Sequence, residues 1–214
     1  MDMGCDGLAM VVTLGSDAAV PCVLVAVFVL LPLVWLIATY NGLVRLRQHV
    51  RESWSGIDTE LRRRYDLIPN LVETVKGYAA HERETLEAVV RARQAAVESR
   101  GSPASQAADE NVLVDTLGRL FALAEGYPDL KASGNFLELQ NELVNTEDRI
   151  QAARRFYNAN VRDLNTRIES FPSNIVAGVF KFTAAEFFEV RDAVVRAAPR
   201  VDVSGRGDDQ TSSG

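Results

Sequence analysis

The feature that most constrains this chain is an uncharged apolar run of 22 residues, Ala18 to Thr39. At a rise of about 1.5 Å per residue, a helix of this length crosses the roughly 30 Å hydrocarbon core of a bilayer. Pro21 and Pro32 would be costly inside a soluble helix, but a membrane span tolerates them when neighbouring groups satisfy the freed carbonyls. A cleaved signal peptide fits less well, because the flank before the run is acidic rather than basic. The run therefore predicts a transmembrane helix over residues 18–39.

The charges that flank this run predict its orientation. No Lys or Arg precedes Arg45, whereas Arg45, Arg47 and Arg51 follow the run closely. Because basic residues favour the cytoplasmic side of a membrane, we expect residues 1–17 to form a short extracytoplasmic N-terminus and most of the chain to lie in the cytoplasm.

Beyond the run, apolar residues recur at helical spacings of three and four. One stripe extends from Leu43 to Ala79, and it continues in phase past Pro69, which predicts a kink rather than a break. Further helices are predicted over residues 82–100, from Pro103 to just before Pro128, and from Asn135 to Phe171. The sequence holds no alternating strand pattern longer than a few residues. We therefore predict an all-α fold: an N-terminal transmembrane helix followed by a long antiparallel four-helix bundle within residues 40–190.

Two segments need separate interpretation. The polar composition of residues 191–214 predicts a disordered tail. The segment after Pro172 is unusually rich in Phe, and it either covers the apolar stripe of its own helical hairpin or contacts the membrane or a partner. Its candidate contact residues are Ile175, Val176, Val179, Phe180, Phe182, Phe187 and Phe188.

Few residues are suited to chemistry. Neither His49 nor His81 completes the Glu-x-x-His pair that ferritin-like bundles use to hold metals. Cys5 and Cys22 lie in or before the apolar run, so the soluble part lacks the roughly four N or S ligands of a zinc site. The sequence also has no GxxxxGK or GxSxG pattern. We therefore expect no catalysis, no metal and no cofactor, and the formal net charge of −6 argues against a nucleic-acid partner.

Polar residues close to the apolar stripes predict a network between the first and fourth helices of the bundle. Its candidate members are Asp66, Asn70, Glu73, Thr146, Glu147, Arg154 and Asn158. Such a network would fix the register of the two helices, and a ligand pocket beside Pro69 is the functional alternative. The basic cluster Arg62 to Arg64 is interpreted as a solvated or salt-bridged helix face.

Several stretches of the sequence are characteristic of one family. They are YNGLV (Tyr40–Val44), WSGID (Trp54–Asp58), RRYDLIPNLVETVKGYAAHE (Arg63–Glu82), AEGYPDLK (Ala124–Lys131), NTEDRI (Asn145–Ile150), RRFYN (Arg154–Asn158) and FPSNIVA (Phe171–Ala177). Over roughly Leu31 to Glu189 the chain resembles the LemA family of bacterial membrane proteins. The resemblance implies a single-pass protein of the bacterial inner membrane with a cytoplasmic helical bundle, and it implies no reaction.

Three functions remain open from the sequence. We expect a membrane-anchored helical scaffold or adaptor that binds another membrane protein or itself. The first alternative is a lipid-facing or self-assembling module that organises membrane. The second alternative is a sensor of a small ligand at the region around Pro69.

Overall fold

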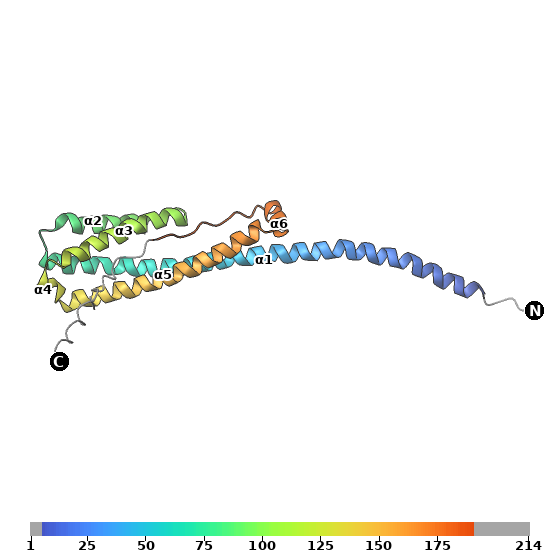
Figure 1. The fold of residues 1–214 in the computed structure, drawn as a ribbon, viewed down its shortest axis with the longest axis horizontal. Helices are drawn as coiled ribbons and strands as arrows, with labels where there is room; N and C mark the ends of the chain where they lie inside the picture. The colour runs from blue at the N-terminus through green and yellow to red at the C-terminus, as the bar shows by residue number, and fades with distance from the viewer. Residues whose placement is uncertain (1–5, 191–214) are drawn as a thin grey trace, which may run out of the picture. The chain divides into compact units, whose positions relative to one another are not determined.

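The computed structural model describes the backbone of residues 6–190 and the side chains of residues 27–190. This part of the chain forms helices joined by shorter connections (Figure 1). The helices are α1 (Asp6–Tyr78), α2 (Arg83–Glu98), α3 (Pro103–Ala124), α4 (Pro128–Lys131), α5 (Gly134–Glu169) and α6 (Ser173–Val179). The tail predicted over residues 191–214 and the first five residues of the predicted N-terminal segment lie outside the described residues.

The chain divides into two compact units. The span unit comprises the chain up to Asp58 together with Ala153–Phe187, and the bundle unit comprises Thr59–Ala152 together with the chain from Phe188. Helices α1 and α5 contribute residues to both units. Helices α2, α3 and α4 belong to the bundle unit, and α6 belongs to the span unit.

Helix α1 contains the apolar run. It begins before Ala18 and continues through Pro69 without interruption. In the described part of the chain, α1 is the one helix long and apolar enough to cross a membrane. Its apolar side chains are open to the surroundings there, with Phe28 82%, Leu31 64% and Val34 61% exposed. A continuous apolar surface of this kind is costly in water and suits contact with lipid acyl chains.

In the span unit, α1 packs against α5 through aliphatic and aromatic side chains. Leu43 and Ile57 of α1 and Val161 of α5 are fully buried. The Trp54 ring of α1 meets Tyr157 of α5 edge to face, with ring centroids 5.3 Å apart. This arrangement adds to the stabilisation from burial, because the positive edge of one ring faces the negative face of the other.

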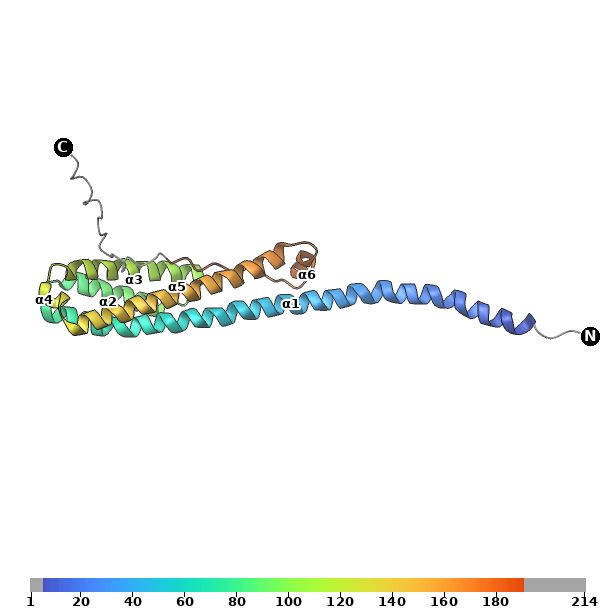
Figure 2. The same ribbon diagram turned by 60° about the horizontal axis from the view of Figure 1, so that its bottom comes forward.

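In the bundle unit, parts of α1 and α5 share one core with α2 and α3. Helices α2 and α3 lie side by side in both side views (Figures 1 and 2). The Phe121 ring of α3 and the Phe136 ring of α5 lie 6.1 Å apart, and Arg93 Nε of α2 donates a hydrogen bond to the Tyr65 carbonyl of α1 at 2.7 Å. The fully buried aliphatic side chains of this core are Leu61, Ile68, Leu71, Val75, Val89, Leu113, Leu120 and Leu130.

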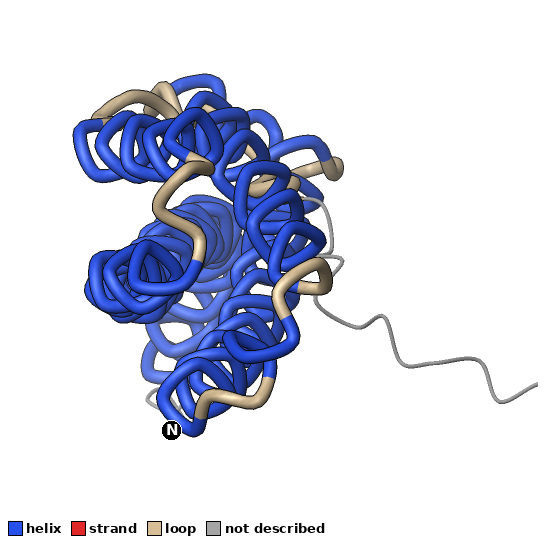
Figure 3. Tube along the Cα trace, turned by 90° about the vertical axis from the view of Figure 1, so that its left-hand side faces the viewer, coloured by secondary structure: helices blue, strands red, loops and turns tan. Residues whose placement is uncertain are grey.

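The predicted all-α fold is confirmed: the chain has an apolar N-terminal helix of membrane-spanning length followed by a helical bundle. The view along the bundle shows helices and loops and no strand in the described residues (Figure 3). Two local details differ from the prediction. Helix α5 begins at Gly134, one residue before the predicted start at Asn135, and ends at Glu169, two residues before Phe171. An additional turn, α4, precedes it, because Pro128 has the backbone angle that the first position of a helix requires.

Candidate functional site

Three charged side chains of the bundle unit lie on buried faces of their helices. Arg64 follows buried Leu61 by three residues and precedes buried Ile68 by four, so it lies on the inner face of α1. Glu110 has Ala107 and Leu113 three residues away on either side. Glu147 lies between Leu143 and Ile150 in the same way. Each of the three charged residues therefore stands at helical spacing from buried aliphatic residues. As a result, three helices each place one charged side chain in the core.

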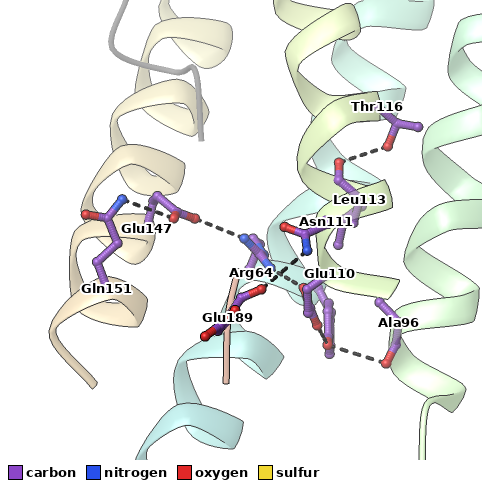
Figure 4. Close-up of polar contacts among 10 residues, drawn as sticks. Arg64, Ala96, Glu110, Asn111, Leu113, Thr116, Glu147, Gln151 and Glu189 are labelled. Atoms are coloured by element: carbon purple, nitrogen blue, oxygen red, sulfur yellow. Dashed lines mark hydrogen bonds and ion pairs between the residues drawn. The ribbon is translucent and has the colours of Figure 1, made fainter. Parts of the chain in front are cut away.

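Arg64, Glu110 and Glu147 lie together (Figure 4), and with Tyr65, which bonds to Glu110, they make up what we define as the buried charge cluster. The Arg64 Nη1 atom lies 2.9 Å from Glu147 Oε2, and its Nη2 atom pairs with Glu110 Oε2. The Tyr65 hydroxyl donates a hydrogen bond to Glu110 Oε1. Arg64 is 2%, Glu110 0% and Glu147 7% exposed. One guanidinium thus joins α1 to α3 and to α5.

Two large free-energy terms oppose each other in the buried cluster: the cost of removing the charges from water and the attraction between them. Removing these charges from water costs several kcal/mol per ion, and only close pairing with hydrogen bonds recovers it. Most of the pairing capacity is used here, although Arg64 Nε is buried with no hydrogen-bond partner among the described residues. Loss of one member would leave its partners charged and uncompensated. The cluster therefore favours the one packing of α1, α3 and α5 in which all the pairs form.

Tyr65 reports on the environment of this cluster. Burial raises the pKa of its hydroxyl well above the ordinary value, and the negative charge of Glu110 raises it further. The hydroxyl therefore stays protonated and remains a hydrogen-bond donor to Glu110 over the physiological pH range. Because the cluster is closed to solvent, its groups stabilise helix packing and do not present a surface to a substrate.

The predicted polar connection between the first and fourth helices is present at Glu147 of α5, which pairs with Arg64 of α1, but the predicted membership needs correction. Asp66, Asn70 and Glu73 are exposed, because they lie on the face of α1 opposite the aliphatic stripe. Thr146 is buried, and its hydroxyl donates to the Glu142 carbonyl of its own helix at 2.8 Å. Arg154 and Asn158 are half-buried and belong to the span unit. Of the seven predicted members, the structure brings Glu147 alone into the cluster.

The residues that sequence reasoning missed are Arg64, Tyr65 and Glu110. The cluster Arg62 to Arg64 is predicted to form a solvated or salt-bridged helix face; Arg64 is indeed ion-paired, but it is buried. The signal was its spacing from Leu61 and Ile68. Glu110 carried a similar signal, since Ala107, Leu113 and Leu117 place it within an apolar stripe.

The Phe-rich segment after Pro172 divides between core and surface. Val176 is 1% and Phe188 0% exposed, so these two candidates are core residues of their units. Phe182 is half-buried. The other four candidates are exposed, namely Ile175 at 57%, Val179 at 69%, Phe180 at 47% and Phe187 at 38%.

Helix α6 has one buried and one exposed face. Val176 and Ala177 face inward, whereas Ile175 and Val179, four residues apart, lie together on the outer face. The helix is positioned by buried Ser173, whose hydroxyl lies 2.7 Å from the Arg167 carbonyl oxygen at the end of α5.

The chain that follows α6 is extended and is attached to α5 by side chains. The Asn165 amide donates to the Ala185 carbonyl at 2.9 Å, and its oxygen accepts from the Ala185 N–H at 2.8 Å. The Tyr157 hydroxyl donates to the Glu186 carbonyl at 2.9 Å. The segment therefore covers part of its own helical hairpin while four of its apolar side chains face outward.

The exposed apolar part of α1, the helical bundle and its buried ion pairs indicate a membrane-associated protein of the helical-bundle class. The chain belongs to the LemA family, whose family model matches residues 53–203.

Curated relatives agree with this assignment. The chain is 28% identical to Magnetosome protein MamQ 2 of Paramagnetospirillum magneticum, over 74% of this chain and 67% of the relative. It is 26% identical to Magnetosome protein MamQ of Magnetospirillum gryphiswaldense, with the same shares covered. It is also 29% identical to Protein LemA of Metamycoplasma hominis, over 64% of this chain and 63% of the relative.

Proposed function

We propose that this protein is a membrane-anchored helical scaffold or adaptor of the bacterial inner membrane, with its N-terminus outside and its bundle in the cytoplasm. Arg45, Arg47 and Arg51 support this orientation, because all three are exposed and follow the apolar part of α1. Another membrane protein, or a second copy of this chain, is the expected partner.

The observation that carries the proposal is that one helix supplies both anchor and core. Helix α1 contains the exposed apolar residues from Val27 to Ile37 and also the buried bundle residues Leu61, Ile68 and Val75. The apolar anchor and part of the bundle core are therefore segments of one helix. The buried charge cluster serves packing, so the outer faces of the bundle are what the protein offers to a partner.

Photo-crosslinking in living cells tests the scaffold role. A photoreactive phenylalanine analogue is placed at Val90 and Val97, which are 48% and 45% exposed on one face of α2, and at Val112 on α3. Fully buried Val89 is the control, and it should give no intermolecular adduct. We expect one membrane protein, or this chain itself, to recur in adducts from one face. Well-expressed variants that give no adduct from any exposed face would contradict the proposal.

A second function is favoured by the outward apolar side chains of α6. Contact of this helix with lipid would suit a module that organises membrane, and it would add to the anchoring by α1. The two functions are compatible, because they use different surfaces of the chain.

A further inference from the structure

We propose that α6 is a second membrane contact, which inserts its outer apolar face into the lipid interface beside the point where α1 leaves the membrane. The contact is the α6 patch, defined as Phe171, Ile175, Val179 and Phe180. This inference rests on the proposed crossing of the membrane by α1, but it does not depend on the scaffold role.

The α6 patch consists of four exposed apolar side chains that lie close together in the sequence. Phe171 is 80% exposed directly before α6, and Phe180 is 47% exposed directly after it. Between them, Ile175 and Val179 lie one helical turn apart on the outer face. Val176 and Ala177, on the opposite face of α6, are buried in the core. Insertion of such outward apolar side chains into a membrane interface is favourable, because the binding free energy scales with the apolar area that is buried.

Contacts with α1 place this patch at the boundary of the bilayer. The Phe180 ring lies 4.7 Å from the Tyr40 ring, and the Phe182 ring lies 5.9 Å from it. Tyr40 directly follows Thr39, where the apolar run ends. Tyr is enriched at this level of membrane helices, because its ring is apolar and its hydroxyl is polar. Through the contact of Phe180 with Tyr40, the α6 patch lies next to the end of the apolar run of α1, and we therefore propose lipid as its occupant.

Cationic side chains accompany the patch, as expected next to lipid headgroups. Arg45, Arg47 and Lys181 are exposed, and the Arg47 guanidinium lies 5.0 Å from the centre of the Phe182 ring. Glu169, at the end of α5, is the acidic side chain nearest to the patch in sequence. The basic excess favours anionic headgroups over neutral ones.

Lys181 provides an independent argument. Its φ of 55° is in the left-handed region, which favours glycine. The Phe182 N–H bonds to the Ala177 carbonyl at 2.9 Å, and the Lys181 N–H bonds to the Gly178 carbonyl at 3.2 Å. This is the Schellman pattern of a helix end, in which glycine is usual at the position of Lys181. A lysine at this position carries backbone strain. Contact of its cation with lipid headgroups would explain why lysine and not glycine stands here.

Fluorescence quenching of the full chain in lipid vesicles tests the inference. Cys5→Ser and Cys22→Ala first remove the native thiols, and a single cysteine that carries an environment-sensitive fluorophore then replaces Val179. The vesicles contain phosphatidylcholine with phosphatidylglycerol, and a fraction of the lipids carries a nitroxide on the upper acyl chain. Phe156→Cys on α5 is the matched control, since Phe156 is also apolar and is 63% exposed in the same unit. Val34→Cys on α1 reports whether the anchor has inserted.

The expected result is strong lipid quenching at positions 34 and 179 and several-fold weaker quenching at 156. Iodide in the water should quench the probe at 156 and not the probe at 179. Lys181→Gly should reduce lipid quenching at 179 when phosphatidylglycerol is present and should leave position 34 unchanged.

Two results would overturn the inference and leave the anchor intact. In both, the probe at 34 is quenched by lipid and the probe at 179 is not. Access of iodide to position 179 would mean that the patch faces water, and exclusion of iodide would mean that protein covers it. Loss of lipid quenching at 34 as well would instead refute the membrane crossing on which the proposed function depends.

Discussion

The Nη1 atom of Arg64 lies 2.9 Å from Glu147 Oε2, although 83 residues separate the two in sequence. The same guanidinium pairs with Glu110 of α3. A single side chain of α1 therefore links this helix to two others.

Arg64→Met should destabilise the protein severely. It removes the cation and leaves Glu110 and Glu147 in the core without a partner, which typically costs about 3–5 kcal/mol. Chemical unfolding of the full chain in detergent, followed by circular dichroism, measures the free energy of unfolding. Arg63→Met is the matched control, because the Arg63 side chain is 47% exposed and its change should stay within about 0.5 kcal/mol. Equal losses in the two variants would contradict the assigned role of Arg64.

Replacing the whole cluster with apolar residues should recover most of that stability. In Arg64→Met combined with Glu110→Leu and Glu147→Leu, no buried charge is left unpaired, and such replacements are commonly neutral or stabilising by about 1–4 kcal/mol. The same unfolding measurement checks this, with the Arg64→Met single variant as reference. A triple variant no more stable than the single one would mean that the cost of Arg64→Met comes from lost shape and not from unpaired charge.

Tyr65→Phe should change how stability depends on alkaline pH. The pKa of folded Tyr65 is raised above its ordinary value of 10.0, so its contribution is fully present below pH 10.0 and is lost as the pH rises further. Above that point, wild-type stability should fall faster than that of Tyr65→Phe by about 1.4 kcal/mol per pH unit. At neutral pH the variant should lose about 1.5–3 kcal/mol, because a hydrogen bond to a charged group is removed.

The measurement is the free energy of unfolding at a series of pH values up to about pH 11, within one unit of the ordinary tyrosine pKa. Tyr78→Phe serves as the control, since Tyr78 is 48% exposed. Parallel pH curves for wild type and Tyr65→Phe would show that ionisation of Tyr65 is not coupled to folding.

Asn165→Ala should release the extended segment that follows α6. Its amide makes both hydrogen bonds to the backbone of Ala185, at 2.9 and 2.8 Å, and each is worth about 1 kcal/mol net. Hydrogen exchange read out by mass spectrometry should show loss of protection in peptides that include Ala185. Exposed Asn174 provides the control, because Asn174→Ala should leave the same peptides protected. Unchanged protection in Asn165→Ala would mean that other contacts hold the segment.

Lys181→Gly should stabilise the folded state slightly. The left-handed conformation costs a non-glycine residue roughly 1–2 kcal/mol, which glycine avoids. Glycine also raises the entropy of the unfolded chain, and this offsets about 0.4–1 kcal/mol of the gain. A net gain of about 0.5–1 kcal/mol is expected from chemical unfolding. Thr183→Gly, two residues further along, should give no gain. A loss of stability in Lys181→Gly would show that the lysine side chain makes a stronger contact than its backbone strain costs.

Local patterns in the sequence were sufficient for the helices and the apolar span. The spacing from Leu43 to Ala79 predicted the part of α1 that follows the apolar run, and Pro103 marked the start of α3, because helical period and helix-start signals act between near neighbours. The same patterns did not identify α6, since its seven residues are too few to show a period. They also left open which side chains after Pro172 face outward.

The sequence by itself determined the fold class, the single apolar span and its basic flank, because each depends on residues a few positions apart. Only the tertiary structure decided that Arg64 is buried while Asp66, Asn70 and Glu73 are exposed, and that Glu110 and Glu147 meet at one guanidinium. It also decided that Phe180 lies against Tyr40. These relationships join residues far apart in the chain, and a charged side chain on a helix reveals its partner only when the helices that pack around it are in place.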